Sequence, residues 1–235
     1  MDRTTRHDLK SDKFVQEVAH SVEFFEKHRG SFIRYGAIVL ALVIAGTGIF
    51  YFMKSRKAAR IAELSASMEV YNSTVGADDM GGRMKVYPTE EARQAAIKKE
   101  FSGLISRNAG SEEAGVASYL LGVNAADQGN IAEARKYLSD AVKDGGKEYG
   151  SLAKLALAGI ARSEGKMAEA ETLLRELVNS PSTFVGQQQA TIELAKLIAP
   201  TKPEEARKLL EPLKTENTTA GRTALTLLAD LSKGK

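Results

Sequence analysis

The sequence of 235 residues contains no cysteine, no tryptophan and only three histidines, at positions 7, 20 and 28. The absence of cysteine excludes disulfides, thiolate metal sites and cysteine nucleophiles. Because no histidine follows residue 28, most of the chain also lacks the side chain on which hydrolytic triads and transition-metal sites usually depend. We therefore expect no catalytic residue, no metal site and no cofactor.

The chain also lacks a dominant charge, since 33 Lys and Arg residues face 30 Asp and Glu residues for a net charge of +3. This balance excludes a strongly basic nucleic-acid binder and an acidic disordered tail. Hydrophobic residues make up 43% and charged residues 27% of the chain, as in ordinary soluble proteins of one or two domains. We therefore expect no nucleic-acid partner.

One long apolar run departs from this average. Residues 35–53 read YGAIVLALVIAGTGIFYFM and carry no charge. As a helix this run extends about 28 Å, close to the hydrocarbon thickness of a bilayer. A buried core helix and a cleaved signal peptide are the alternatives. The run begins after 34 residues and ends in bulky side chains, which favours a single uncleaved transmembrane anchor.

Basic residues flank this run almost evenly. Within 20 residues of its ends, three Lys and Arg residues precede it and four follow it. The positive-inside rule therefore leans only weakly toward a cytoplasmic N-terminus. A short segment before the span and a large domain after it favour the same orientation.

Residues 1–34 are expected to form a cytoplasmic tail with an amphipathic helix. Ser11 or Asp12 can cap this helix, and Gly30 suits its end. Its apolar face would carry Phe14, Val18, Val22 and Phe25. The helix either docks on a partner or the lipid surface, or is only the lead-in to the span.

Residues 54–110 are expected to form membrane-proximal helices. Residues 56–75 contain strong helix formers without glycine or proline, and the glycine-rich stretch 76–82 predicts an exposed loop. Thr89 is expected to open a helix that ends near Gly110, and Ser111 to open the next.

An internal repeat begins beyond residue 110. The stretches GNIAEARKYLSDAV from Gly129, GKMAEAETLLRELV from Gly165 and TKPEEARKLLEPLK from Thr201 recur with a period of 36. An apolar helix precedes each stretch, so each unit is a helix, a tight turn and a second helix. Such a period indicates a solenoid, although unrelated helices are the alternative. The residues expected to pack the helices together are Gly122, Gly129, Ala134, Leu138, Ala158, Gly165, Ala170, Leu174, Ala206 and Leu210.

These units resemble tetratricopeptide repeats at their small and apolar positions, among them Leu121, Gly122 and Ala134. The third unit departs from the pattern, because Thr201 replaces the turn glycine and Glu193 replaces a core leucine. The resemblance implies an all-α chain, in which a single N-terminal transmembrane helix precedes a tetratricopeptide-repeat-like solenoid. Residues 111–235 would hold the divergent repeats and a C-terminal capping helix.

In tetratricopeptide arrays the first helix of each unit lines a concave groove. The resemblance implies a protein-binding groove at Val116, Tyr119, Val123, Leu152, Leu155, Gly159 and Arg162, continued in the third unit by Gln188, Thr191, Ala195 and Ile198. This apolar groove suits an extended or helical apolar segment. Alternatively, the groove packs against the N-terminal helix of its own domain.

The whole layout also resembles the YfgM-type ancillary subunits of the SecYEG translocon. The segment FFEKHRG at residues 24–30, a single span, the helix RKAARIAELSASMEVYN and divergent repeats carry this resemblance. It implies a bacterial inner-membrane protein with a cytoplasmic N-terminus and a periplasmic repeat domain. The implied partners are the translocon, a membrane-anchored periplasmic chaperone and nascent secreted proteins.

Two other classes compete with this interpretation. An enzyme would need a paired acid and base, but Glu133, Glu169 and Glu205 occupy equivalent repeat positions, which predicts solvated faces. No phosphate-binding loop or hydrolase motif is present. A structural scaffold that coordinates envelope or cell-wall assembly is the remaining alternative.

Overall fold

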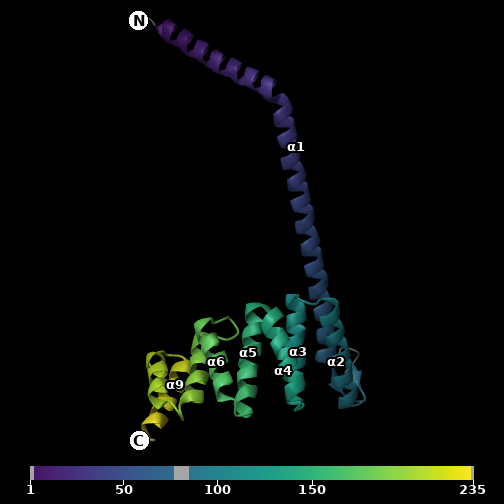
Figure 1. Ribbon diagram of the computed structural model, residues 1–235, viewed down its shortest axis with the longest axis vertical. Coiled ribbons are helices and arrows are strands. Elements are labelled where there is room, and N and C mark those ends of the chain that lie inside the picture. The colour runs from purple at the N-terminus through teal and green to yellow at the C-terminus, as the bar shows by residue number, and fades with distance from the viewer. Residues whose placement is uncertain (1–2, 77–84, 234–235) are drawn as a thin grey trace. The chain divides into compact units, whose positions relative to one another are not determined.

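The computed structural model describes residues 3–76 and 85–233, in which helices account for nearly all regular structure. The chain divides into two compact units, Met1–Ala59 and Arg60–Lys235. The first unit is helical throughout its described part, as the beginning of α1 (Arg3–Tyr71). The second contains the end of α1 and the remaining elements (Figure 1).

α1 contains one segment that is long and apolar enough to cross a membrane. Its side chains between residues 33 and 59 are exposed, so its apolar surface is not covered by the residues that the structure describes. The expected helix end at Gly30 is wrong, because α1 continues through this glycine without interruption. The side chains of Phe14, Val18, Val22 and Phe25 lie outside the described residues.

A small connection joins α1 to α2 (Glu90–Arg107). The strands β1 (Thr74–Val75) and β2 (Val86–Tyr87) form a parallel pair that the sequence did not predict. Arg93 supports the connection by donating to the backbone oxygens of Tyr71 and Ser73, each at 2.8 Å. Apart from Gly76, the expected loop at residues 76–82 lies outside the described residues.

Local capping fixes where the next two helices begin. Thr89 accepts a hydrogen bond from the amide of Ala92, and Ser111 accepts one from the amide of Ala114, both at 3.2 Å. The first of these residues opens α2 and the second opens α3 (Glu112–Asp127). Both helix starts agree with the capping expected from the sequence, since these side chains satisfy amides that have no partner within the helix.

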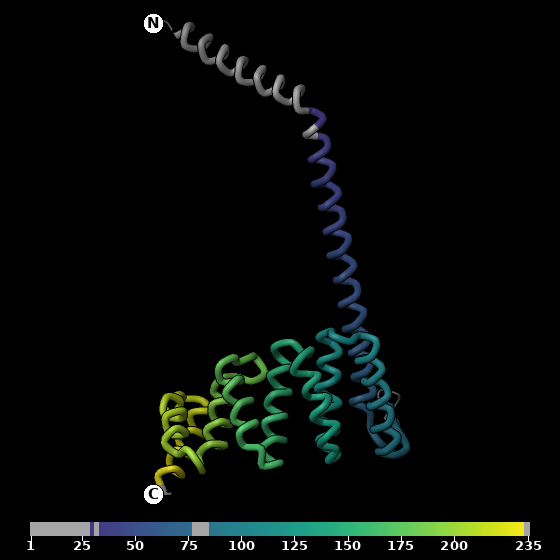
Figure 2. The backbone as a smooth tube through the Cα atoms, viewed as in Figure 1, coloured from purple at the N-terminus to yellow at the C-terminus, as the bar shows by residue number. Residues whose placement is uncertain are grey.

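Three helix pairs follow α2 in chain order. They are α3 with α4 (Ile131–Asp144), α5 (Gly146–Ser163) with α6 (Met167–Asn179), and α7 (Gln187–Ile198) with α8 (Pro203–Leu210). A 3₁₀ turn, η1 (Glu211–Leu213), and the final helix α9 (Thr219–Lys233) close the array. The backbone reverses after each helix, so neighbours in the sequence lie side by side (Figure 2). This arrangement confirms the expected all-α, repeat-like fold.

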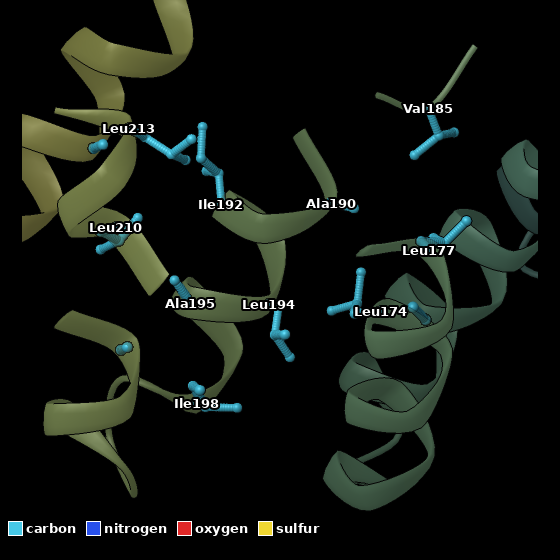
Figure 3. Packing of buried hydrophobic residues seen from close by; sticks show 13 residues of the cluster. Leu174, Leu177, Val185, Ala190, Ile192, Leu194, Ala195, Ile198, Leu210 and Leu213 are labelled. Carbon is cyan, nitrogen blue, oxygen red and sulfur yellow. The ribbon is translucent and has the colours of Figure 1, made fainter. Parts of the chain in front are cut away.

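The core is divided along the array into three apolar clusters. The first joins the end of α1 to α2 and α3, the second joins α3, α4 and α5, and the third extends from α5 to α9. In the third cluster, Leu174 and Leu177 lie on one side of α7 while Leu210 and Leu213 lie on the other (Figure 3). Each helix pair therefore buries its apolar surface against the next pair, as in a solenoid.

Candidate protein-binding face

The expected packing residues lie at the helix contacts or in the turns. Gly129 and Gly165 occupy the turns within their helix pairs with φ of 75° and 76°, a conformation that side chains disfavour. At Gly122 a β-carbon would lie 2.7 Å from Cγ of Leu138, so a larger residue would have to displace this buried leucine between α3 and α4. The remaining packing residues are all buried: Ala134, Leu138, Ala158, Ala170, Leu174, Ala206 and Leu210.

In the first unit the expected groove residues are more buried than an open surface requires. Val116 belongs to the core, and Tyr119 and Val123 are half-buried against the second apolar cluster. Burial raises the pKa of the Tyr119 phenol, and nearby Tyr71 and Tyr149 add to this effect. Only Tyr119 and Val123 of these three residues therefore reach the surface in part.

A row of aromatic rings joins α3, α5 and the connection between α6 and α7. Tyr119 meets Tyr149 edge to face with ring centroids 5.5 Å apart, and Tyr149 meets Phe184 at 5.4 Å. Phe184 lies in the connection before α7, where its amide donates to Glu148 at 3.0 Å. Sequence periodicity could not reveal this row, because its members occupy different positions in their repeats.

The second unit presents the most open part of the face. Leu152 and Leu155 are half-buried, whereas Gly159 and Arg162 are exposed. Three of these expected groove residues, Leu155, Gly159 and Arg162, line one pocket of about 330 Å³ between α5 and α7. Its other lining residues are Ala158, Leu174, Gln189, Glu193 and Leu197.

Three of the four expected groove residues of the third unit are wrong, because they are buried. Thr191, Ala195 and Ile198 are buried, and the exposed Gln188 donates to Glu216 at 3.1 Å. Four residues connect α7 to α8, whereas three connect the helices of each earlier pair. The core leucine nevertheless lies nearer the following helix, since 12 positions separate Leu194 from Ala206 whereas 13 separate Leu157 from Ala170. The register of α7 is therefore shifted by one position from the period of 36, and a different set of side chains faces outward.

The shifted register also changes the interpretation of Glu193, which the sequence analysis placed at a core leucine position. Leu194 occupies the core position at 1% exposure, so Glu193 does not replace a core leucine. Glu193 instead lies beside the pocket and accepts a hydrogen bond from Lys196 at 2.8 Å. The third unit therefore keeps an apolar contact between its helices, although its turn differs from those of the first two units.

The end of α1 does not border the pocket. Leu64, Met68 and Val70 of α1 pack in the first apolar cluster with α2 and α3. No residue of α1 is among those that line the pocket between α5 and α7. Within the described residues, α1 therefore does not fill the pocket between α5 and α7.

The repeated glutamates are paired across neighbouring units, in addition to being partly solvated. Glu133 pairs with Lys98 at 2.7 Å, Glu169 with Arg135 at 2.7 Å and Glu205 with Arg175 at 2.5 Å. Lys98 belongs to α2, and the two arginines come from the second helix of the preceding pair. These contacts give the carboxylates a role in joining units, which the sequence analysis missed.

Acidification is expected to weaken one of these contacts between units, the ion pair of Arg135 with Glu169. Hydrogen bonds from Arg135 lower the pKa of both Glu164 and Glu169 below the usual carboxyl range. A lowered folded-state pKa gives stability that is present above the unfolded pKa and is lost as pH falls through the folded one. Arg135→Gln should therefore lower the melting temperature at pH 7 more than at about pH 3, near and below ordinary carboxyl pKa values.

Circular dichroism of residues 60–235 at the two pH values measures this effect. Lys143→Gln, an exposed change on the same helix α4, is the matched control and should leave the melting temperature unchanged. An equal loss at both pH values would contradict a stabilising role for the Arg135 carboxylate pairs.

Comparison with known proteins identifies a family model described as a tetratricopeptide repeat-like domain, which matches residues 23–176. The match covers more than half of the chain and ends within α6. The pair of α7 and α8 lies beyond the matched residues. No curated protein and no solved structure matches the chain.

Proposed function

Because this chain belongs to the tetratricopeptide repeat-like domain family, we propose that its helical array binds protein segments beside a membrane to which α1 anchors it. The open pocket between α5 and α7 is the observation that carries this proposal. Repeat arrays bind partners through extended surfaces that their stacked helices create. The apolar segment of α1 supplies the anchor.

The proposed role is binding without catalysis. The array has neither cysteine nor histidine, and its recurrent carboxylates at Glu133, Glu169 and Glu205 are engaged by bases of neighbouring units. Such pairs stabilise charge and do not provide an acid and a base poised at a shared substrate. The chemistry of this face therefore suits recognition.

The proposed partners follow from the resemblance to the YfgM-type ancillary subunits. In this proposal the protein is an inner-membrane protein whose array lies in the periplasm, where it associates with the Sec translocon and a membrane-anchored chaperone. It would assist secreted or envelope proteins as they emerge. The similarity of the tail, span and repeat layout supports this assignment.

Purification from detergent-solubilised membranes tests the partner assignment. The full chain should recover translocon subunits and the chaperone, whereas a chain ending at residue 59 should lose the partners that need the array. Recovery of cell-wall machinery alone would favour the scaffold alternative. Recovery of the same partners by both chains would contradict a binding role for the array.

The proposed topology predicts where a protease can act. In spheroplasts, added protease should remove the array after Lys54 and leave the N-terminal tail protected, because only the periplasmic side is accessible. A tag at either end, followed by immunoblotting, distinguishes the two fragments. Protection of the array until the membrane is permeabilised would contradict the orientation.

A further inference from the structure

Gly159 is a glycine that the fold itself does not require. It lies inside α5 and is exposed, and a β-carbon at this position would meet no atom within 4 Å. By contrast, a β-carbon at Gly150 of the same helix would lie 3.3 Å from the backbone oxygen of Val142. Because glycine weakens a helix interior relative to alanine, packing within the chain does not explain Gly159.

The position of Gly159 suggests a reason outside the chain. It borders the pocket between α5 and α7, whose apolar wall is formed by Leu155, Ala158, Leu174 and Leu197. A glycine on a helix surface lets a second backbone approach more closely than any side chain permits. The missing side chain therefore leaves space for a partner at this pocket.

The composition of the pocket favours a helical partner over an extended one. Only Arg162, Gln189 and Glu193 contribute polar side chains to it. An extended segment would bring unpaired backbone amides and carbonyls against the apolar wall, which costs free energy unless they find hydrogen-bond partners. A helix satisfies these groups internally and presents only its side chains.

The charged side chains beside the pocket indicate which charge a partner should carry. Arg162 is half-exposed and lies 3.9 Å from Glu193, whereas Lys196 reaches the same carboxylate at 2.8 Å. Two bases thus share one acid, and the guanidinium of Arg162 is the more loosely held of the two. A carboxylate on the partner would complement this excess positive charge.

We propose that the pocket between α5 and α7 receives the apolar face of a partner helix, with Gly159 admitting its close approach and Arg162 pairing with its carboxylate. This inference rests on the proposed protein-binding function and specifies the chemistry of the segment bound. Leu155 and Leu197 contact the apolar side chains of that helix, and the rim charges set its orientation.

Synthetic peptides test this proposal with the full chain in nanodiscs. The probe is a fluorescent, side-chain-stapled helix of about 15 residues, or four turns, with Leu and Ala on one face and Glu at the border of that face. A second peptide carries Lys in place of Glu, and a third carries central prolines that prevent a helix. Fluorescence anisotropy should show the Glu helix binding about tenfold more tightly than either alternative.

Variants of the pocket separate binding from folding. Gly159→Leu should weaken binding of the Glu helix about tenfold or more, and Arg162→Gln should remove the preference for Glu over Lys. Gly159→Ala should raise the melting temperature yet weaken binding. Its control, Gly103→Ala in α2, should raise the melting temperature without affecting binding, because a β-carbon there meets only the flexible side chain of Arg107.

Three results would overturn the proposal: equal binding of the proline peptide, unchanged binding by Gly159→Leu, or preference for the Lys helix. Self-association of the chain that Gly159→Leu abolishes would identify a second copy as the occupant and would also overturn it. If the peptides give one of these contradicting results while purification still shows partners that depend on the array, the inference of a helical partner fails and the proposed function stands. If no partner depends on the array, the proposed function fails as well.

Discussion

Gly115→Val is expected to unfold the first helix pair or to displace α3 from its neighbours. A β-carbon at this position would lie 2.1 Å from the backbone nitrogen of Gly145 and 2.3 Å from the carbonyl carbon of Asp144. These are backbone atoms at the junction of α4 and α5, so they cannot move aside as a flexible side chain can. The loss in unfolding free energy should reach about 4 kcal/mol, at the upper end of overpacking effects.

Thermal unfolding of residues 60–235 measures this loss, since this unit contains all three apolar clusters. A change of about 4 kcal/mol corresponds to a fall of roughly 8–16 °C for a unit of this size. Gly159→Val is the matched control, because a β-carbon there meets nothing within 4 Å. A Gly115→Val melting temperature equal to that of the control would contradict the close approach of α3 to this connection.

Ala170→Arg should cause a loss of similar size in the second helix pair. Ala170 lies on α6 with no exposed surface, where the structure provides no room for a long side chain. Arginine would either overpack this contact or leave a charge without water or a partner, and both are costly. We expect destabilisation by about 4 kcal/mol.

Ala168→Arg is the control for this change, because position 168 lies on the same helix and is exposed. Chemical denaturation of residues 60–235 should show a lower midpoint for Ala170→Arg and an unchanged one for Ala168→Arg. Equal midpoints would mean that the small residue of the repeat does not face its partner helix.

Sequence periodicity predicted both helices of each unit, but it gave the wrong register for the first helix of the third unit. Ala134, Ala170 and Ala206 recur at a fixed period and are all buried in the structure. In the third unit, however, α7 is offset from α5 by 37 residues and not by 36, because Leu194 lies 12 positions before Ala206 whereas Leu157 lies 13 before Ala170. Leu194 thereby enters the core, which an alignment anchored on α8 cannot show.

The sequence alone also did not predict which side chains of neighbouring units contact each other. The ring contacts of Tyr149 with Tyr119 and Phe184 depend on how the connection before α7 folds back toward α5. The pairing of Glu169 with Arg135 depends on the angle between successive helix pairs. Local propensity and periodicity carry no information about either quantity. They predict which residues share a helix face, not which faces meet.

Site-specific photo-crosslinking in living cells tests the central claim most directly. A photoreactive phenylalanine at Leu155, which lines the pocket, is compared with one at Ser139, an exposed position on α4. The account predicts discrete adducts with partner proteins from position 155, and their loss when Gly159 is also changed to leucine. Equal adducts from both positions, or none from position 155, would contradict a protein-binding face between α5 and α7.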